Sequence, residues 1–357
     1  MEQIAPTRFF LGANSVRGFS SLYDSFTDPA AGEFLWVIKG GPGCGKSTFM
    51  KKLGAAAEQA GQAVEYIHCS GDPDSLDAVW FPALRTGYVD GTAPHVIEAT
   101  YPGASSLYLD MGTFLDAGAL EKHLPEIVEL NRRYKALYAE AYALLAAAGP
   151  LLPENAAGLY GAEEAAKIDK KLAGLAAREL KRLNKPAKIS HRFLSAYSCQ
   201  GRVFFRESVD TFCERVCTLD NALGLGRRYL ERLAAIAAGS GNDAVLCHDP
   251  LEPEKLEAVL LPEAGIAFLA LDKPDTCSKP WRHLRLDTLA DRETVSQKKA
   301  LLRARRRESG ALLDSAMETL AQAKALHDEL EAVYREHVDF SGADALARDH
   351  IGWLLGK

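Results

Sequence analysis

Residues 34–50, FLWVIKGGPGCGKSTFM, decide the fold of this chain. The segment opens with five apolar or aromatic residues, which predict a buried strand. Residues 40–47, GGPGCGKS, then fit G-x-x-x-x-G-K-[ST] at every fixed position. The residues from Ser47 to about Ala60 are rich in helix formers. A strand, a glycine-rich loop and a helix in this order predict a phosphate-binding loop in an α/β fold.

Each residue type in this loop has a chemical task. Glycine permits backbone angles that let successive N–H groups turn inward around phosphate oxygens. Lys46 would bridge the β- and γ-phosphates of ATP, and Ser47 would offer a hydroxyl ligand to Mg²⁺. The predicted nucleotide-binding residues are Gly41, Pro42, Gly43, Cys44, Gly45, Lys46, Ser47 and Thr48. Cys44 is interpreted as a small packing residue, with a redox role as the alternative.

A second Mg²⁺ ligand is expected at the end of a strand. Asp90 follows a third apolar stretch, and the carboxyl end of a strand in an α/β sheet is where ligands bind. We therefore predict that Asp90 acts with Lys46 and Ser47 in catalysis and metal binding. Two alternatives remain open, a simple Asp-Gly turn at Asp90 and a rival carboxylate at Asp110.

Composition excludes several classes of protein. The chain has 357 residues and a formal net charge of −6, so we do not expect nucleic-acid binding through bulk charge. We expect no signal peptide and no membrane-spanning helix, because no basic leader and no long apolar run is visible. The seven cysteines show no CxxC spacing, as is typical of free thiols. A cytoplasmic protein with more than one core is expected.

Long helical arms are predicted outside the sheet-forming segments. Alanine, leucine and charged residues dominate residues 121–186, and apolar residues at steps of three and four form a stripe over residues 127–148. Gly149 and Pro150 should end this helix, and a second helix over about residues 162–183 is expected to return along it. Another arm is expected over residues 292–338.

The chain also repeats itself. Residues 68–82, HCSGDPDSLDAVWFP, align without a gap on residues 248–262, HDPLEPEKLEAVLLP, at a constant offset of 180 (248 − 68 = 180). Residues 10–18 align in a similar way on residues 193–201. Self-similarity of this extent predicts a tandem duplication.

The second copy lacks the phosphate loop. At the offset of 180, two of the loop glycines fall on Leu223 and Leu225, and no Gly-Lys-Ser/Thr follows. Leucine side chains oppose the inward turn of the N–H groups, so we predict a degenerate copy that is kept for structure. Arg227 is the residue that would contact a phosphate there. The strand that ends at Asp90 should recur over residues 266–272.

These patterns predict an α/β chain with a duplicated P-loop NTPase-like three-layer fold, in which each copy is followed by a long helical arm. We predict four segments. They are a P-loop NTPase domain at 1–119, a helical arm at 120–188, a degenerate NTPase-like repeat at 189–290 and a C-terminal helical arm at 291–357.

The chain resembles a bacterial family of tandem P-loop ATPase-like proteins that is common in clostridia and their relatives. The resemblance covers nearly the whole chain and is carried by residues 40–48, 68–82, 89–104 and 326–340. It implies a P-loop fold and ATP binding, without a particular substrate. In that family the second half can also carry a phosphate loop, and this sequence departs from the family there.

Three functions share the predicted nucleotide site. The first, which we expect, is a slow Mg-dependent ATPase that drives or regulates a partner; it should be slow because Gly91 follows Asp90 where many ATPases place a glutamate that orients water. The second is a small-molecule or nucleotide kinase. Its acceptor would be held near His68, Asp72, Asp74 and His95, and Arg132 and Arg133 of the arm could close over the phosphates. A structural role for His68 at a strand end is the alternative to that assignment.

The third function is a non-enzymatic scaffold gated by nucleotide. It would bind a protein partner, or a second copy of itself, through the helical arms. The basic residues 303–307, RARRR, could contact an acidic partner, and a solvated helix face is the alternative explanation for them. Release of free phosphate would support the ATPase, and loss of ATP that depends on an acceptor would support the kinase.

Overall fold

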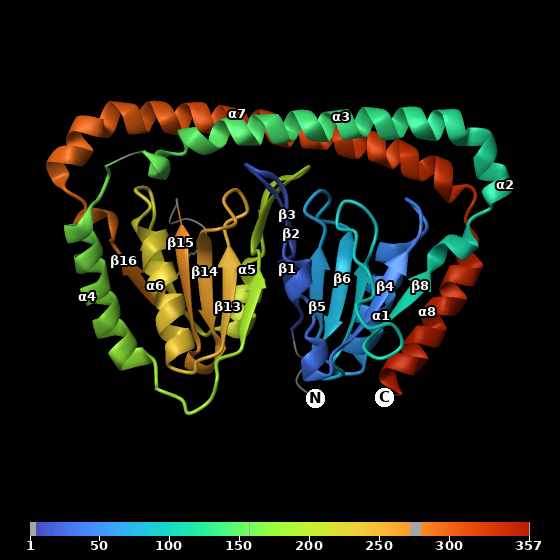
Figure 1. The fold of residues 1–357 in the computed structure, drawn as a ribbon, viewed down its shortest axis with the longest axis horizontal. Coiled ribbons are helices and arrows are strands. Elements are labelled where there is room, and N and C mark those ends of the chain that lie inside the picture. The colour runs from blue at the N-terminus through green and yellow to red at the C-terminus, as the bar shows by residue number, and fades with distance from the viewer. Residues whose placement is uncertain (1–4, 157, 272–279, 357) are drawn as a thin grey trace.

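The computed structural model describes residues 5–156, 158–271 and 280–356. Over these residues the chain forms two six-stranded sheets that lie side by side (Figure 1). The first sheet contains β1 (Thr7–Phe10), β4 (Phe34–Lys39), β5 (Glu65–His68), β6 (Leu76–Phe81), β7 (Thr86–Asp90) and β8 (Ser106–Asp110). The second contains β9 (Ile189–Arg192), β12 (Arg215–Asp220), β13 (Ala244–His248), β14 (Leu256–Leu261), β15 (Ile266–Leu271) and β16 (Arg282–Leu284).

The two sheets have the same topology. The strand order is β1-β5-β6-β7-β4-β8 in the first sheet and β9-β13-β14-β15-β12-β16 in the second. In each sheet the third strand is antiparallel to both neighbours, and every other neighbouring pair is parallel. The predicted α/β class is therefore confirmed. The antiparallel β6 was not predicted, because three aspartates in and before it interrupt its apolar pattern.

A hairpin follows the first strand of each sheet. In the first half it consists of β2 (Gly12–Ser15) and β3 (Gly18–Ser21), and in the second half of β10 (Ser195–Ser198) and β11 (Gly201–Phe204). Gly18 and Gly201 begin β3 and β11 with φ of 96° and 89°, angles that favour glycine. The alignment of residues 10–18 with 193–201 thus corresponds to one shared structural unit.

Equivalent residues of the two halves pair with each other where the sheets meet. The Phe10 N–H donates to the Phe193 carbonyl and the Phe193 N–H donates to the Phe10 carbonyl, each at 2.9 Å. Two further contacts exchange roles in the same way, Arg17 with Glu254 and Gln200 with Asp74. Reciprocal pairing of this kind is the mark of a two-fold relation, here within one chain.

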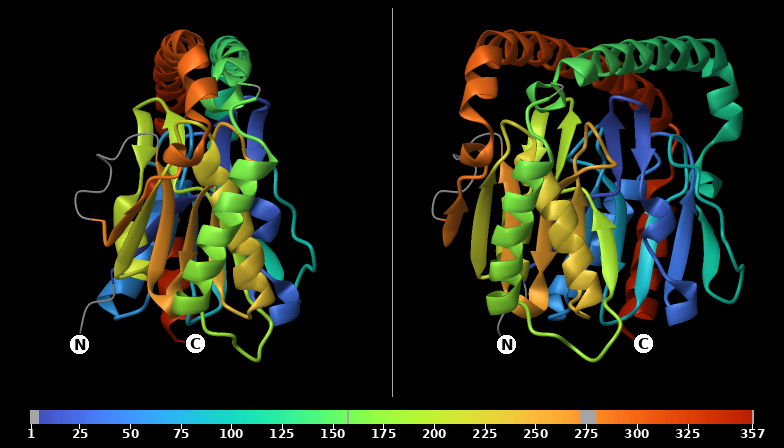
Figure 2. Two further views of the ribbon diagram at one scale, coloured as in Figure 1. Left: turned by 90° about the vertical axis from the view of Figure 1, so that its left-hand side faces the viewer. Right: turned by 60° about the vertical axis from the view of Figure 1, so that its left-hand side comes forward.

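Two long helices run antiparallel across the top of both sheets (Figures 1 and 2). They are α3 (Leu124–Ala148) and α7 (Arg292–Arg335), and both were predicted. At a rise of about 1.5 Å per residue, the 44 residues of α7 extend for roughly 66 Å. None of the helices in the described part of the chain is both long enough and apolar enough to cross a membrane.

Each long helix carries a further helix to the opposite sheet. α3 leads to α4 (Ala162–Glu179), which packs on α6 (Leu225–Gly239) of the second half. α7 leads to α8 (Phe340–Leu355), which packs on α1 (Lys46–Gln59) of the first half. The prediction that residues 162–183 return along α3 is wrong. The apolar side chains of α4 enter the core of the second sheet instead, and they include Ile168, Leu172 and Leu175.

Candidate functional site

The loop between β4 and α1, residues 40–45, has the backbone that its sequence predicts. Gly40, Gly43 and Gly45 have φ of 154°, 67° and 91°, all in the region that favours glycine. α1 begins at Lys46, directly after the left-handed Gly45. A parallel strand, this loop and a helix N-terminus follow one another, which is the arrangement that offers N–H donors to an anion.

Lys46 and Asp90 form the charged pair of the site. Lys46 Nζ lies 3.6 Å from Asp90 Oδ2, and the two side chains are only 11% and 15% exposed. Nζ also donates hydrogen bonds to the carbonyl oxygens of Gly40 and Gly41, at 3.1 and 2.9 Å. Asp90 is in reach because β7 is the parallel neighbour of β4, with Ile38 opposite Asp90.

The two alternatives for Asp90 differ in their geometry. Asp90 Oδ1 accepts hydrogen bonds from the N–H and the hydroxyl of Thr92, at 2.9 and 2.6 Å, so Asp90 stabilises the turn as well as facing Lys46. Asp110, at the end of β8, is exposed and accepts a hydrogen bond from the Gly112 N–H at 2.7 Å. Of the two carboxylates, Asp90 is the one that lies beside the loop lysine.

The other predicted loop residues have different surroundings. Ser47 Oγ accepts a hydrogen bond from the Leu76 N–H at 2.9 Å, which fixes the hydroxyl at the start of β6 and leaves a second lone pair on its oxygen. The Thr48 side chain is exposed. Cys44 is fully buried, and burial raises the pKa of its thiol, so it packs as a protonated side chain.

The end of α7 covers the loop. A Cβ atom on Gly43 would lie 2.8 Å from the carbonyl oxygen of Glu331, and one on Gly41 would lie 3.1 Å from the ring of Tyr334. Both glycines are therefore needed for close approach, and Gly43 is needed for its backbone angle as well. Sequence reasoning placed no part of the C-terminal arm here, because the contact depends on the crossing of α7 from the second half to the first.

The matching loop of the second sheet is occupied by the protein's own groups. α6 begins after Gly224, whose φ of 79° is close to that of Gly45. The loop between β12 and α6 is shorter, so this glycine lies one residue away from where the offset of 180 puts it. The N–H groups of Ala222 and Leu223 donate to the carboxylate of Asp287, at 3.1 and 3.3 Å. An internal carboxylate therefore uses the donors of this loop.

Arg227 is also committed to internal contacts. Its side chain is 7% exposed and forms ion pairs with Glu154, Asp249 and Glu252, the first and last at 3.0 Å. The guanidinium is thus held by three carboxylates, which repel anions. Arg227 is not placed to contact a phosphate. Ala270 stands where the offset puts the counterpart of Asp90 (90 + 180 = 270), and Asp272, which ends the predicted recurrence, lies outside the described residues.

His68 closes a turn at the end of β5. Its Nε2 accepts a hydrogen bond from Arg8 Nη1 at 3.3 Å, so the proton is on Nδ1, which donates to the Pro73 carbonyl at 2.6 Å. His248 makes the same contact with Pro253, also at 2.6 Å, although its half has no phosphate loop. A shared structural role at the strand end accounts for both histidines.

The other side chains assigned to a kinase acceptor site are also engaged elsewhere. His95 is 8% exposed and stacks on Tyr23, with ring centroids 4.7 Å apart, and its Nε2 lies 3.8 Å from Asp77 Oδ1. Asp72 faces Lys324 of α7 at 3.4 Å. The structure does not bring His68, Asp72 and His95 together around one open space.

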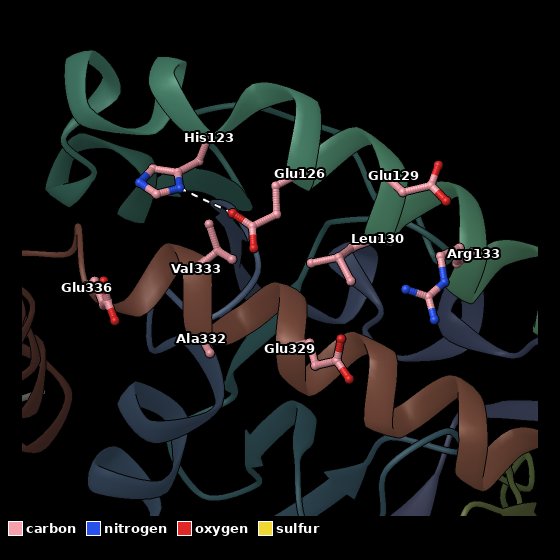
Figure 3. A pocket seen from close by; sticks show the side chains of 9 residues that line it. All are labelled: His123, Glu126, Glu129, Leu130, Arg133, Glu329, Ala332, Val333 and Glu336. Atoms are coloured by element: carbon pink, nitrogen blue, oxygen red, sulfur yellow. Dashed lines mark hydrogen bonds and ion pairs between the residues drawn. The ribbon is translucent and has the colours of Figure 1, made fainter.

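A groove lies between α3 and α7, on the outer part of the arms (Figure 3). It is lined by His123, Glu126, Glu129, Leu130, Arg133, Glu329, Ala332, Val333 and Glu336. Four carboxylates against one arginine make it unsuitable for the phosphates of a nucleotide. Among the residues that the structure describes, no group of three or more His, Cys, Asp or Glu is arranged to hold a metal ion.

Comparison with known proteins adds no family to this picture. No protein-family model, no curated protein and no solved structure matches the chain. The resemblance to tandem P-loop ATPase-like proteins therefore stays a prediction from the sequence motifs, and the function has to be argued from the geometry around Lys46.

Proposed function

We propose that this protein binds Mg-ATP at the loop between β4 and α1 and hydrolyses it slowly. The observation that carries the proposal is the placement of Lys46 3.6 Å from Asp90, beside a loop with three glycines at positive φ. A lysine at this point can bind the β- and γ-phosphates, and the carboxylate at the end of the neighbouring strand can bind the metal ion. The ammonium group of Lys46 now donates to two glycine carbonyl oxygens, and phosphate oxygens can take their place as acceptors.

The donor set is suited to Mg²⁺. This ion binds oxygen ligands, and it is held by one or two carboxylates together with substrate phosphates and water. The Ser47 hydroxyl and the Asp90 carboxylate are oxygen ligands of that kind, and a larger carboxylate cluster is not required. When bound, the ion would neutralise charge on the β- and γ-phosphates.

We further infer that the chain is a tandem duplication of a P-loop NTPase-like unit, with one nucleotide site per chain. The shared strand order supports this inference, and so does the offset of 180, which carries β6 directly onto β14 (76 + 180 = 256). In the second half, Asp287 accepts the hydrogen bonds of the loop N–H groups, and carboxylates pair with Arg227. A nucleotide would need both of these groups. We therefore expect one ATP to bind to each protein molecule.

Slow turnover follows from the residue after Asp90. A Cβ atom on Gly91 would lie 2.5 Å from Val37, so the glutamate that many ATPases carry at this point has no room here. A partner that moves α7 would act directly on the loop, since the end of α7 touches Gly43. We propose regulation of a partner through the helical arms on this basis.

The substitution Lys46→Ala tests the site. A hydrogen bond to a charged group contributes about 1.5–3 kcal/mol, so the Kd for Mg-ATP should rise roughly 10- to 150-fold. Isothermal titration calorimetry measures this change and the stoichiometry together. Lys52→Ala is the matched control, because Lys52 lies on the same helix, is 40% exposed and pairs with Asp344. It should bind Mg-ATP like the unaltered protein.

Phosphorus NMR with Mg-ATP, alone and with a pooled metabolite extract, then separates the functions. Free phosphate that appears without extract, and that Lys46→Ala abolishes, is the result expected of an ATPase. A new phosphoester that appears only with extract would identify a kinase. Bound but unchanged ATP in both samples would leave a nucleotide-gated scaffold. Equal affinity of Lys46→Ala and the unaltered protein would show that this loop is not the site.

A further inference from the structure

Residues 326–340, LHDELEAVYREHVDF, have no chemical task in the function proposed so far. They form the end of α7 and the turn into α8. Glu331 and Tyr334 touch the glycines of the loop, and the Asp116 N–H donates to the His337 carbonyl at 2.9 Å. The segment thus comes from the second half of the chain and is fixed against the candidate site of the first half.

His327 is the side chain of this segment with the strongest claim to a chemical role. It lies one helical turn before Glu331, and its Nδ1 is 3.7 Å from Glu331 Oε1. Its ring packs edge-on against Tyr134 of α3, with centroids 5.5 Å apart. The positive charge of Lys46 is among the causes that lower the pKa of His327. The imidazole therefore lies between α3 and α7, one turn before the part of α7 that meets the loop, with the Glu331 carboxylate 3.7 Å from Nδ1.

We propose that His327 is the catalytic residue that accepts a proton from the attacking water, and that Glu331 positions it. This inference rests on the proposed ATPase function and supplies the group that is missing after Asp90. Because Nδ1 is on the Glu331 side, Nε2 is the nitrogen that takes the proton. A histidine with a carboxylate that orients its ring is a common design for a general base.

The step conserves atoms and charge. The water oxygen forms a bond to the γ-phosphorus while its proton passes to Nε2 of His327. The bond between the γ-phosphorus and the β–γ bridging oxygen breaks, and the electron pair stays on that oxygen, which becomes part of ADP. Inorganic phosphate leaves, and the imidazolium returns its proton to solvent.

Burial favours the neutral form of His327, which is the form that can act as a base, while the charges around the ring act in both directions. The charges are carried by α7, by the loop and by the turn after β5, whose Asp72 pairs with Lys324. Tyr134 faces the ring from α3. The groups are Lys324, Asp328, Glu331, Lys46 and Asp72. Burial is the largest cause that lowers the pKa of His327 below its ordinary 6.5; Glu331 and Asp328 oppose this, and Lys324 and Lys46 add to it.

Single-turnover release of phosphate from Mg-ATP, measured between about pH 5 and 8.5, tests the proposal. His327→Gln should lower the rate about 100-fold or more, the usual range for loss of a general base, while the Kd for Mg-ATP stays within about threefold. The rate of the unaltered protein should fall in acid as His327 takes up a proton. That acid limb should be absent in His327→Gln.

Two glutamates two residues apart on α7 provide a matched pair. Glu331→Gln should move the midpoint of the acid limb to lower pH, because the negative charge that raises the pKa of His327 is gone. Glu329 lines the groove between α3 and α7 (Figure 3), so Glu329→Gln removes the same charge from the same helix and should keep both the rate and the acid limb. A purely structural role of Glu331 would not shift the limb.

The results separate this inference from the function on which it rests. An unchanged rate or an unchanged acid limb in His327→Gln overturns it, and so does loss of Mg-ATP binding in that variant, which would make His327 a binding residue. Mg-ATP binding without any single-turnover phosphate release by the unaltered protein also overturns it, while leaving the nucleotide site intact. Absence of Mg-ATP binding overturns the proposed function itself.

Discussion

His68 is neutral in the folded protein because both of its ring nitrogens have fixed partners. Nε2 accepts from the Arg8 guanidinium, and Nδ1 donates to the Pro73 carbonyl. A proton on Nε2 would face that guanidinium, and the ring is buried among apolar groups such as Phe10 and Phe205. Burial is the main cause that lowers the pKa of His68 from 6.5 to about 4.

This shift makes the stability of the protein depend on pH. His68 has the lower pKa in the folded state, so its contribution to stability is complete above pH 6.5. This contribution is lost as the pH falls from 6.5 to about 4, because over that range the unfolded chain binds the proton and the folded protein does not. Between pH 7 and 5 the free energy of unfolding should fall by about 2 kcal/mol through His68 alone. Urea unfolding at the two pH values measures the change.

The variant His68→Gln should lose this part of the pH dependence, and the same replacement at the exposed His123 controls for removal of a histidine in general. Equal pH dependence in His68→Gln and the unaltered protein would contradict the assignment. The residue His248, whose pKa is also lowered by burial, adds a dependence of the same sign and remains in both proteins.

Single residues differ in how far the sequence reveals their role. Lys46 and Ser47 are predictable because the chemistry of phosphates fixes their spacing from the loop glycines. His327 is 281 residues from Lys46 (327 − 46 = 281), and only the crossing of α7 brings its helix to the loop. Its place in an amphipathic helix suggests no more than a side chain near a helix surface, so it was not among the predicted site residues.

At the scale of the elements, two glycines inside helices make opposite demands. Gly310 is in the middle of α7, and a Cβ atom there would meet nothing within 4 Å. Gly54 is in α1, and a Cβ atom there would lie 2.4 Å from the ring of Tyr66. The Tyr66 hydroxyl donates a hydrogen bond to Glu58, which fixes the ring in place. Gly54 is thus required for packing, whereas Gly310 only weakens its helix.

Alanine substitutions at the two positions should therefore differ in sign. Gly310→Ala should raise the free energy of unfolding by about 0.5–1 kcal/mol, because alanine has the higher helix propensity. Gly54→Ala should lower it by about 1–3 kcal/mol, because Tyr66 or α1 has to move. The midpoints of urea unfolding compare the variants, and a change of the same sign in both would contradict this account of α7.

Elements with a strong internal pattern were predictable, and those defined by a partner were not. The stripe over residues 127–148 and the charged run of the C-terminal arm correspond to α3 and α7 within a few residues. Residues 18–21 form β3 because they pair with β2, and their own sequence, GFSS, has no apolar pattern that indicates a strand. α4 shows its own apolar stripe, yet the sequence does not say which core that stripe enters.

At the scale of the whole molecule, the two halves are held together by exchanged helices. α4 belongs to the first half by sequence and packs on the second sheet, and α8 does the reverse. Above both sheets, the paired helices α3 and α7 connect the exchanged helices α4 and α8 to the rest of the chain (Figure 1). A change at the loop next to Gly43 is therefore transmitted first to a helix that begins at the other sheet.

The exchange predicts that the chain can be cut without falling apart. The connection between α4 and β9 is largely exposed, and a protease site inserted between Asn184 and Lys185 leaves one fragment with the first sheet, α3 and α4 and another with the second sheet, α7 and α8. After cleavage, α4 still covers α6 and α8 still covers α1. We expect the fragments to coelute in gel filtration as one species of 38.8 kDa.

A denaturing gel of that peak should show two bands, and the uncut insertion variant is the control for elution. Coelution should persist on dilution to micromolar protein, because separation would expose the apolar faces of α1 and α6 and of the long helices together. Fragments that elute separately would mean that each half keeps its own terminal helix in solution. The cleaved complex should also still bind Mg-ATP, since Lys46, Asp90 and the end of α7 remain assembled across the cut.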